Sequence, residues 1–322
     1  MVHDAPVHTR RSRMKVFVTG ATGFVGQEIV QQLHHAGHSV RLLVRKRNSR
    51  PVQEAVARCG AEVHVGNVLE AASLDGALEG MEAAIHLVGI ISEVGESTFE
   101  NVHTRGTRNV AAAAQAAAIR RFIQMSALGT RPNAAARYHQ SKWAAEVLVR
   151  RSGLDYTIFR PSLIYGPRDQ FVNLFARIIR FSPFVPVIGG GRARFQPVSV
   201  KAVARAFVRA LCEPKSIGQC YDLCGPETFT MPELLDHIFA LMRKKRFKLR
   251  VPLVLARAQA AFLEFLFQRV LKKAPPLNRD QLVMLEEDNV GDARAANELF
   301  GLRHAPFREE AARYLTPSPR PA

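Results

Sequence analysis

The sequence predicts an α/β fold in which a doubly wound parallel sheet carries a smaller C-terminal lobe. In the first half of the chain, short apolar runs alternate with amphipathic segments, which is the pattern of repeated strand–helix units. A glycine-rich turn, Thr19 to Gly26, joins the first apolar run to the first helical segment. A chain of 322 residues, 47% of them hydrophobic, can bury the core of one large domain with a lobe attached.

The expected elements follow in order around this turn. The apolar run at residues 15–18 predicts a strand buried on both faces, and residues 24–33 predict an amphipathic helix. Further strands are expected at residues 39–44, 61–65, 83–88, 121–125 and 156–159, and helices at 52–58, 101–118 and 136–151. Right-handed crossovers between parallel strands place these helices on both faces of one sheet.

The strand–helix alternation loosens after Pro161. A helix is expected at residues 171–180, loops at 182–186 and 189–191, and helices at 201–212 and 232–244. These segments should build the lobe over the carboxyl edge of the sheet, where folds of this class bind ligands.

Gly20, Gly23 and Gly26 have the spacing G-x-x-G-x-x-G between a strand and a helix. Glycine allows a sharp turn and a close approach of the backbone, and the start of a helix offers free N–H groups. This combination predicts a site for the pyrophosphate of a dinucleotide. A glycine-rich turn without a ligand is the plain alternative.

The end of the second expected strand indicates which dinucleotide binds. A carboxylate there would bind the ribose hydroxyls of NAD(H), but the strand runs into Arg45, Lys46 and Arg47 with no acid nearby. Arginine forms charge-assisted bonds with phosphate, so Arg45, followed by Lys46, is expected to bind a 2′-phosphate. NADP(H) is therefore the preferred cofactor, while NAD(H) and a solvated basic turn stay open.

Tyr138 and Lys142 are the strongest candidates for catalytic residues. Residues four apart share one face of the helix expected at 136–151. A nearby ammonium favours phenolate, so Lys142 is expected to lower the pKa of Tyr138, and it can also bind nicotinamide ribose hydroxyls. Ser126, after the preceding strand, could donate a second hydrogen bond to a substrate oxygen. An ordinary surface pair is the alternative.

Together these residues resemble the short-chain dehydrogenase/reductase superfamily in its extended or atypical branch. The resemblance rests on the glycine-rich turn, Ser126, the Tyr138–Lys142 pair and the run Arg160-Pro161-Ser162-Leu163-Ile164-Tyr165-Gly166-Pro167. A narrower resemblance, in residues 171–177, 188–198, 277–281 and 288–290, is to the NADPH-binding accessory subunit of respiratory complex I and its bacterial relatives.

The resemblance implies roles for the residues at matching positions. It assigns the pyrophosphate to Gly20, Thr22, Gly23, Phe24, Val25 and Gly26. It assigns adenine to Asn67 and Val68, and the adenine-ribose side to Leu87, Val88 and Gly89. It assigns the nicotinamide carboxamide to Pro161, Ser162, Leu163 and Ile164, and catalysis to Ser126, Tyr138 and Lys142. Asn67 and Ala202 depart from the family, in which Asp is frequent at both positions.

The charge balance favours anionic partners. Lys and Arg number 45 against 28 Asp and Glu, which gives a net charge of +17. A basic run at residues 243–250 precedes an apolar helical stretch at 254–269, in which Arg257, Glu264 and Gln268 lie near one line. One interpretation is an interfacial helix beside anionic lipid, or a seat for a lipophilic substrate or partner. The other is a core helix behind a solvated basic loop.

Other classes of function lack support in the sequence. Embedded charges argue against a membrane-spanning helix, and no recognised module combines a basic patch with interleaved aromatic residues for nucleic acid. The four cysteines, Cys59, Cys212, Cys220 and Cys224, lack zinc spacing and are too few for a disulfide scaffold, so no metal is expected. The expected location is the cytoplasm. A peripheral position on the inner face of a membrane is the alternative.

Three functions stay open. The first is an NADP(H)-dependent oxidoreductase acting on a carbonyl or alcohol of lipophilic or quinone-related kind. The second is an NADPH-holding accessory or assembly factor of a respiratory or quinone-biosynthesis complex, and the third is an NAD-dependent sugar-nucleotide epimerase or dehydratase. The expected division is a disordered basic arm at 1–13, an NAD(P)-binding domain at 14–226, of which part of 160–200 contributes to the lobe, and a C-terminal substrate or partner lobe at 227–322.

Overall fold

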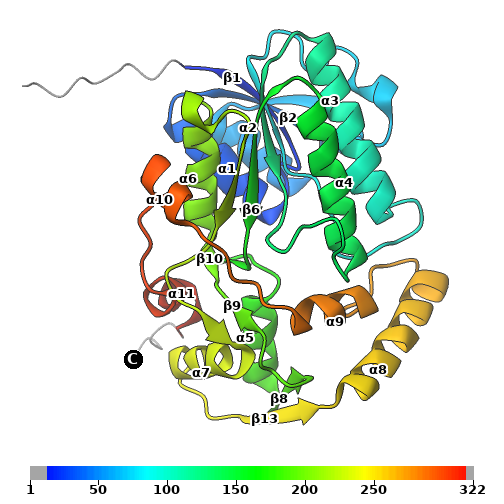
Figure 1. The fold of residues 1–322 in the computed structure, drawn as a ribbon, viewed down its shortest axis with the longest axis vertical. Coiled ribbons are helices and arrows are strands. Elements are labelled where there is room, and N and C mark those ends of the chain that lie inside the picture. The colour runs from blue at the N-terminus through cyan, green and yellow to red at the C-terminus, as the bar shows by residue number, and fades with distance from the viewer. Residues whose placement is uncertain (1–12, 317–322) are drawn as a thin grey trace, which may run out of the picture.

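The computed structural model describes residues 13–316, and most of the expected arm at 1–13 lies outside them. Its centre is a seven-stranded parallel sheet with the strand order β3-β2-β1-β4-β5-β6-β11 (Figure 1). The strands are β1 Lys15–Thr19, β2 Ser39–Val44, β3 Glu62–Val65, β4 Ala83–His86, β5 Arg121–Met125, β6 Asp155–Pro161 and β11 Gln219–Leu223. The strand order reverses between β1 and β4, so the predicted doubly wound sheet is confirmed.

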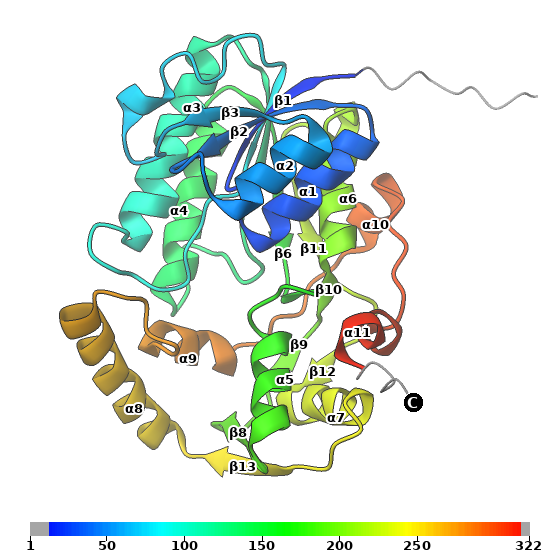
Figure 2. The same cartoon turned by 180° about the vertical axis from the view of Figure 1, so that it is seen from behind.

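Helices cover both faces of this sheet (Figures 1 and 2). They are α1 Phe24–His35, α2 Arg50–Cys59 and α6 Val200–Ala210 on one face, and α3 Gly106–Ala116 and α4 Arg137–Arg151 on the other. Val16, Phe17 and Val18 are fully buried, because β1 has a helical layer on either side. The helix expected at 101–118 is divided, since a π-helical segment, Glu100–Arg105, runs into α3.

The lobe has its own hydrophobic core. Its helices are α5 Val172–Phe181, α7 Met231–Leu241, α8 Leu253–Phe265 with the π-helical segment Leu266–Leu271, α9 Arg279–Glu286 and α11 Phe307–Leu315. Its short strand pairs are β7 Ile164–Tyr165 with β10 Val198–Ser199, β9 Arg194–Phe195 with β12 Phe229–Thr230, and β8 Phe184–Ile188 with β13 Phe247–Val251.

Two expectations are wrong at the strands. The expected loop at 182–186 gives way to β8, in which Val185 and Val187 are buried while Pro186 lies opposite Leu249. Because β8 has a single partner strand, it is an edge strand and tolerates proline. The seventh sheet strand, β11, was not expected either, because its sequence has no apolar run and four of its five residues are partly or fully exposed.

The chain crosses from the lobe back to the sheet near its C-terminal end. α10 Arg294–Leu299 and the following turn place Ala296, Phe300 and Leu302 in the core between the sheet and α6. α11 then returns to the lobe, where Phe307 and Leu315 are buried. The division at 226/227 is therefore not a single cut, since residues 296–302 pack with the first domain.

Candidate functional site

The turn between β1 and α1 requires glycine at two positions. Gly20 has a φ of +73°, and a Cβ there would lie 3.0 Å from the carbonyl carbon of Leu87. A Cβ on Gly26 would lie 2.3 Å from the oxygen of Gly20. Gly23 precedes α1 without a side-chain cap and is exposed together with Thr22. The first turn of α1 therefore presents backbone N–H groups to an approaching anion.

The end of β4 lies directly against this turn. The N–H of Leu87 donates to the oxygen of Thr19 at 3.2 Å, and a Cβ on Gly20 would lie 3.1 Å from the nitrogen of Val88. Leu87 is buried, Val88 is half-buried and Gly89 is exposed. The structure thus brings two of the predicted segments together at the point where the strand order reverses.

The basic turn after β2 contains two uncommitted cations. Arg45 and Lys46 are exposed, and neither forms a hydrogen bond or ion pair with another of residues 13–316. Arg47 differs, because its guanidinium donates to the oxygen of Val63 at 3.2 Å. The charges of Arg45 and Lys46 therefore stay available for an anion.

The turn after β3 is held by its own side chains. The Asn67 amide donates to Glu70 at 3.1 Å and accepts from the backbone N–H of Leu69 at 3.2 Å. Val68 is buried, and its backbone oxygen accepts from Asn109 of α3 at 2.8 Å. Asn67 therefore shapes the loop where the resemblance places adenine, and Val68 anchors the loop to α3.

Lys142 reaches from α4 across the ends of β5 and β4. Its side chain is only 2% exposed, and Nζ donates to the backbone oxygen of Met125 at 3.2 Å. A Cβ on Gly89 would lie 3.0 Å from Nζ, so the ammonium borders the open backbone after β4. Burial lowers the pKa of Lys142 to about 8, while the nearby carboxylate of Glu146 acts in the opposite direction.

Tyr138, one turn before Lys142, lies in an aromatic cluster. Its ring packs edge-on against Phe99, with centroids 6.0 Å apart, and against His103, with centroids 5.4 Å apart. Burial raises the pKa of Tyr138 to about 12, so the expected lowering by Lys142 is wrong. The reason is physical: loss of water disfavours the phenolate, and Nζ of Lys142 is directed to a backbone oxygen.

His103 supports this cluster, although no sequence pattern pointed to it. Ser141 Oγ donates to the oxygen of Tyr138 at 2.7 Å and lies 2.8 Å from His103 Nδ1. The N–H of Ile90 donates to His103 Nε2 at 3.0 Å. Burial, followed by the charge of Lys142, lowers the pKa of His103 to about 2, so the imidazole is neutral. It lies in the π-helical segment, a form that is frequent at functional sites.

Ser126 faces a buried ion pair. Its hydroxyl donates to Glu146 Oε1 at 2.6 Å, and Glu146 is fully buried. Arg160 donates Nε to Oε1 at 2.8 Å and Nη2 to Oε2 at 2.7 Å, and Arg150 lies 3.3 Å from Oε2. The hydroxyl of Ser126 therefore uses its one hydrogen in a bond to Glu146. No sequence pattern had pointed to Glu146.

The segment expected to meet the nicotinamide is tied to the C-terminal part of the chain. Ser162 Oγ donates to Asn289 Oδ1 at 2.6 Å, and the N–H of Leu163 donates to the same oxygen at 3.1 Å. The oxygen of Pro161 accepts from the N–H of Leu128 at 2.9 Å. Ile164 continues this segment into β7. Asn289 thus fixes the loop after β6 from more than a hundred residues away.

The start of α4 is also positioned by the lobe. The carboxylate of Asp280, in α9, accepts from the N–H of Arg137 at 2.7 Å and of Tyr138 at 2.9 Å. Glu93, in the loop after β4, forms a 3.0 Å ion pair with Arg137. An anion at a helix start satisfies free N–H groups and complements the helix dipole, so these contacts orient Tyr138.

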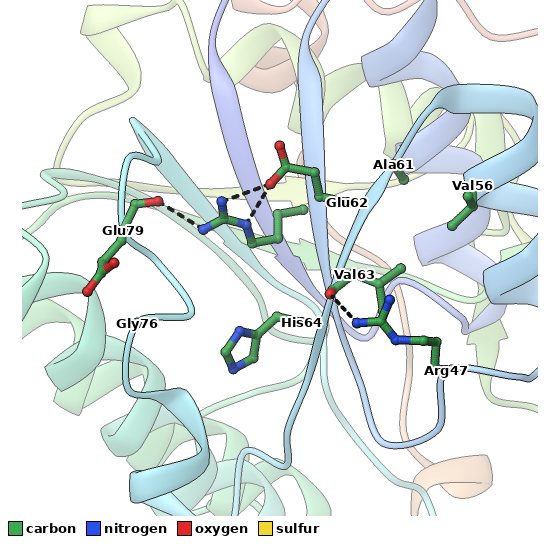
Figure 3. Close-up of a pocket in the computed structure, with 9 residues that line it drawn as sticks. Arg47, Val56, Ala61, Glu62, Val63, His64, Gly76 and Glu79 are labelled. Atoms are coloured by element: carbon green, nitrogen blue, oxygen red, sulfur yellow. Dashed lines mark hydrogen bonds and ion pairs between the residues drawn. The ribbon is translucent and has the colours of Figure 1, made fainter.

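A cavity of about 600 Å³ lies elsewhere, beside the edge strand β3 (Figure 3). Arg41 and Arg47 line it, but Arg41 donates to Glu62 and Glu79, and Arg47 donates to Val63. Its strong donors are committed to the protein itself, so this cavity is not the functional site. Within residues 13–316, no group of three His, Cys, Asp or Glu side chains could hold a metal ion.

The fold and the glycine turn at its switch point define a protein of the NAD(P)-binding class, and residues 20–178 match the NAD(P)H-binding family. The chain is 32% identical to the mitochondrial NADH dehydrogenase (ubiquinone) 1 alpha subcomplex subunit 9 of Arabidopsis thaliana over 85% of this chain and 70% of that protein. It therefore belongs to the NAD(P)-binding family of that subunit.

Two further similarities are to another enzyme sequence and to a solved structure. Ceramide reductase of Caulobacter vibrioides is 35% identical over 64% of this chain and 63% of that protein. The crystal structure of a dTDP-glucose 4,6-dehydratase from Streptomyces venezuelae superposes with a TM-score of 0.73 at 20% identity, covering 94% of this chain and 96% of that one. That second likeness concerns the fold alone.

Proposed function

We propose that the protein binds NADP(H) across the carboxyl edge of the sheet and uses it to reduce a lipophilic carbonyl compound. The observation that carries this proposal is the convergence of the glycine turn at Gly20, the open backbone at Gly89 and the buried ammonium of Lys142. These groups join the cradle for the dinucleotide to the helix that carries Tyr138. A carbonyl substrate also agrees with the similarity to the ceramide reductase of Caulobacter vibrioides.

The residues at this edge fit a dinucleotide. The backbone of Gly20, Thr22, Gly23, Phe24, Val25 and Gly26 would hold the pyrophosphate. Arg45 and Lys46 would bind the 2′-phosphate, and Asn67 and Val68 would flank adenine. Leu87, Val88 and Gly89 would lie along the ribose, and Lys142 would bind the nicotinamide ribose. Pro161, Ser162, Leu163 and Ile164 would meet the carboxamide, with their loop braced by Asn289.

The pKa values suggest a direction for the reaction. NADPH, when bound, supplies a hydride. Tyr138, with a pKa of about 12, keeps its proton at neutral pH, so the protonated phenol is the form that would meet the oxygen of a carbonyl undergoing reduction. Lys142, with a pKa of about 8, is mostly charged at neutral pH. Ser126 acts as a positioning residue, because its hydroxyl and Arg160 both donate to Glu146 of α4.

The cofactor preference is testable with two substitutions. Replacing Arg45 and Lys46 together with alanine is expected to weaken NADPH binding by about 100-fold or more, since each charge-assisted hydrogen bond contributes about 1.5–3 kcal/mol. NADH affinity should stay unchanged, because NADH lacks the 2′-phosphate. Fluorescence titration with each nucleotide measures both affinities.

The matched control for this test is Arg47→Ala, which removes a cation whose guanidinium already donates to Val63. This variant should retain the preference for NADPH. A double variant that loses both nucleotides equally, or neither, would contradict the assignment of Arg45 and Lys46.

A second function is supported by the hydrogen bonds that the site already makes. Ser126 donates to Glu146, and Ser162 and Leu163 donate to Asn289, so several candidate donors serve the protein itself. This supports a role in which NADPH is held in a respiratory assembly, in line with relatives named as NADH dehydrogenase subunits. Nucleotide that stays bound through gel filtration, in a protein that shows no turnover, would favour the role of holding NADPH over catalysis. An NAD-dependent epimerase stays the third candidate, and a strong preference for NADH would favour it.

We also propose that the lobe rests on an anionic membrane surface. α8 packs on the rest of the lobe through Ala256 and Ala260, which are buried against Leu282. Polar contacts border this small apolar face: Arg257 lies 3.6 Å from Glu286, Glu264 forms a 2.7 Å ion pair with Arg279, and Gln268 donates to the loop after β4 at 3.0 Å. The large apolar side chains of α8, among them Phe262 and Phe265, stay exposed.

This exposed apolar surface continues onto β13, which lies with α8 at the end of the molecule away from the large sheet (Figures 1 and 2). Its exposed hydrophobic residues are Phe181, Phe184, Phe247, Leu249, Val254, Leu255, Phe262, Phe265, Val270 and Leu271. Exposed basic residues adjoin it in sequence, namely Arg243, Lys244, Lys245, Arg250, Arg269, Lys272 and Lys273. Apolar side chains flanked by cations suit an anionic lipid surface. No helix within residues 13–316 has the length and apolar content to cross a bilayer.

Vesicle binding tests this surface. The protein should sediment with phosphatidylserine vesicles, and replacing Phe262 and Phe265 with serine should weaken binding by about 100-fold or more, because each buried Phe contributes about 1.5–3 kcal/mol. The control replaces Val56 and Ile217, two exposed residues of the first domain, with serine. This control should not change vesicle binding. Equal sedimentation of both variants would contradict the membrane role.

A further inference from the structure

A second cavity, of about 260 Å³, lies between α6, α11 and the segment that joins α10 to α11. None of its lining residues belongs to the proposed dinucleotide cradle. It lies where the two cores of the molecule adjoin, since α6 packs in the core of the first domain and α11 in the core of the lobe.

The lining of this cavity is unbalanced in charge. Lys201, Arg205, Arg303 and Arg313 line it, against a single carboxylate, Glu310. None of the four cations forms a side-chain hydrogen bond or an ion pair with any of residues 13–316. Elsewhere in the lobe, exposed arginines such as those of α9 and β9 do form ion pairs. All four are exposed, and an anion bound among them would lower the remaining repulsion between their charges.

The remaining groups around the cavity do not neutralise this charge. The hydroxyl of Tyr165 donates to Glu310 at 3.3 Å, and His304 shares a hydrogen bond with Asn297 at 2.8 Å. Burial lowers the pKa of His304, the charge of Glu310 acts in the opposite direction, and the charge of Arg205 lowers the pKa further. Ala202 is buried and contributes only a methyl group. The carboxylate of Glu227, whose charge also acts on Tyr165, accepts from the N–H of Phe307.

We propose that this cavity binds a phosphate group, either as free phosphate or as the phosphate of a small phosphomonoester. Guanidinium groups match phosphate oxygens in charge and geometry. The volume is below the roughly 300–1,000 Å³ of sites for drug-sized ligands, so the cavity suits a phosphate head rather than a whole dinucleotide. Since α6 and α11 belong to different cores, the anion links the lobe to the first domain.

The first test is thermal unfolding in inorganic phosphate against sodium chloride at equal ionic strength. We expect a saturable increase in Tm with phosphate only, because a ligand that binds the native state stabilises it. Arg205→Gln with Arg313→Gln should lose at least tenfold in phosphate affinity. Arg108→Gln with Arg151→Gln removes the same net charge from exposed positions of α3 and α4 and should keep the effect.

Ala202→Asp provides the converse variant, because it supplies the missing carboxylate. This variant should also abolish the increase in Tm with phosphate. If the variant does not fold because position 202 is buried, the Arg205 and Arg313 double variant is the deciding test. NADPH titration of the same variants should be unchanged, which separates this site from the dinucleotide cradle. Tighter binding of glycerol 3-phosphate than of inorganic phosphate would identify a phosphomonoester as the ligand. Equal binding of the two would identify free phosphate as the ligand. Equal Tm values in phosphate and chloride, or an equal loss in the control pair, would overturn the proposal.

Discussion

Replacing Tyr138 with phenylalanine is expected to lower NADPH-dependent turnover by about 10²- to 10⁴-fold, the usual contribution of a positioned proton donor. The ring should keep its edge-on contacts with Phe99 and His103, so the aromatic cluster should stay intact. NADPH affinity should be unchanged, because the proposed cradle is built by other residues. The measurement is the loss of NADPH fluorescence with a panel of lipophilic ketones and quinones, together with a binding titration.

Tyr221→Phe is the matched control for this experiment. It removes a hydroxyl from β11, where the ring packs with Phe159 and Phe300, and should leave turnover intact. Full activity of the Tyr138 variant would exclude this hydroxyl as the proton donor. Absence of turnover in the unaltered protein, with nucleotide bound, would favour the holding role over catalysis.

The second large effect is expected on stability. Glu146→Gln should lower the free energy of unfolding by about 3 kcal/mol, since removing one member of a buried ion pair costs roughly 3–5 kcal/mol and Arg160 stays partly exposed. Glu146 is fully buried and accepts from both Arg160 and Ser126. Neutralising it also removes the charge that holds up the pKa of Lys142, so that pKa should fall further below its present value near 8.

Urea denaturation of Glu146→Gln and of Glu54→Gln measures this effect against a control. Glu54 forms an ion pair with Arg50 at 2.8 Å, a distance similar to that of the buried pair, but the Arg50 side chain is 90% exposed. Exposed pairs contribute at most about 1 kcal/mol, so this variant should be nearly neutral. Equal destabilisation by the two substitutions would show that burial does not set the strength of the Glu146 cluster.

The sequence predicted the parts of the fold that depend on local patterns. Continuous apolar runs identified β1, β2, β4 and β5, and the expected helices α1, α4, α5 and α6 begin and end within a few residues of their expected limits. Glycine spacing identified the turn at Gly20, whose need for glycine depends on φ and on close contacts within the turn. β8 and β11 were missed because edge strands can be short, half-exposed or interrupted by proline.

The sequence could not predict contacts between distant segments. Asp280 caps α4, and Asn289 braces the loop after β6, from positions more than a hundred residues further along the chain. Ser126 was expected to face substrate, whereas its hydroxyl donates to Glu146. The pKa of Tyr138 was expected to fall, because a sequence shows a lysine four residues away but not the burial that raises that pKa.

Calorimetric titration with NADPH and NADH measures whether the protein binds a nicotinamide dinucleotide and which one it prefers. We expect saturable binding of one nucleotide per chain, with NADPH bound more tightly than NADH. The difference between the two affinities should disappear in the variant that lacks both Arg45 and Lys46. No heat on adding either nucleotide to protein freed of bound small molecules, or tighter binding of NADH, would contradict the account.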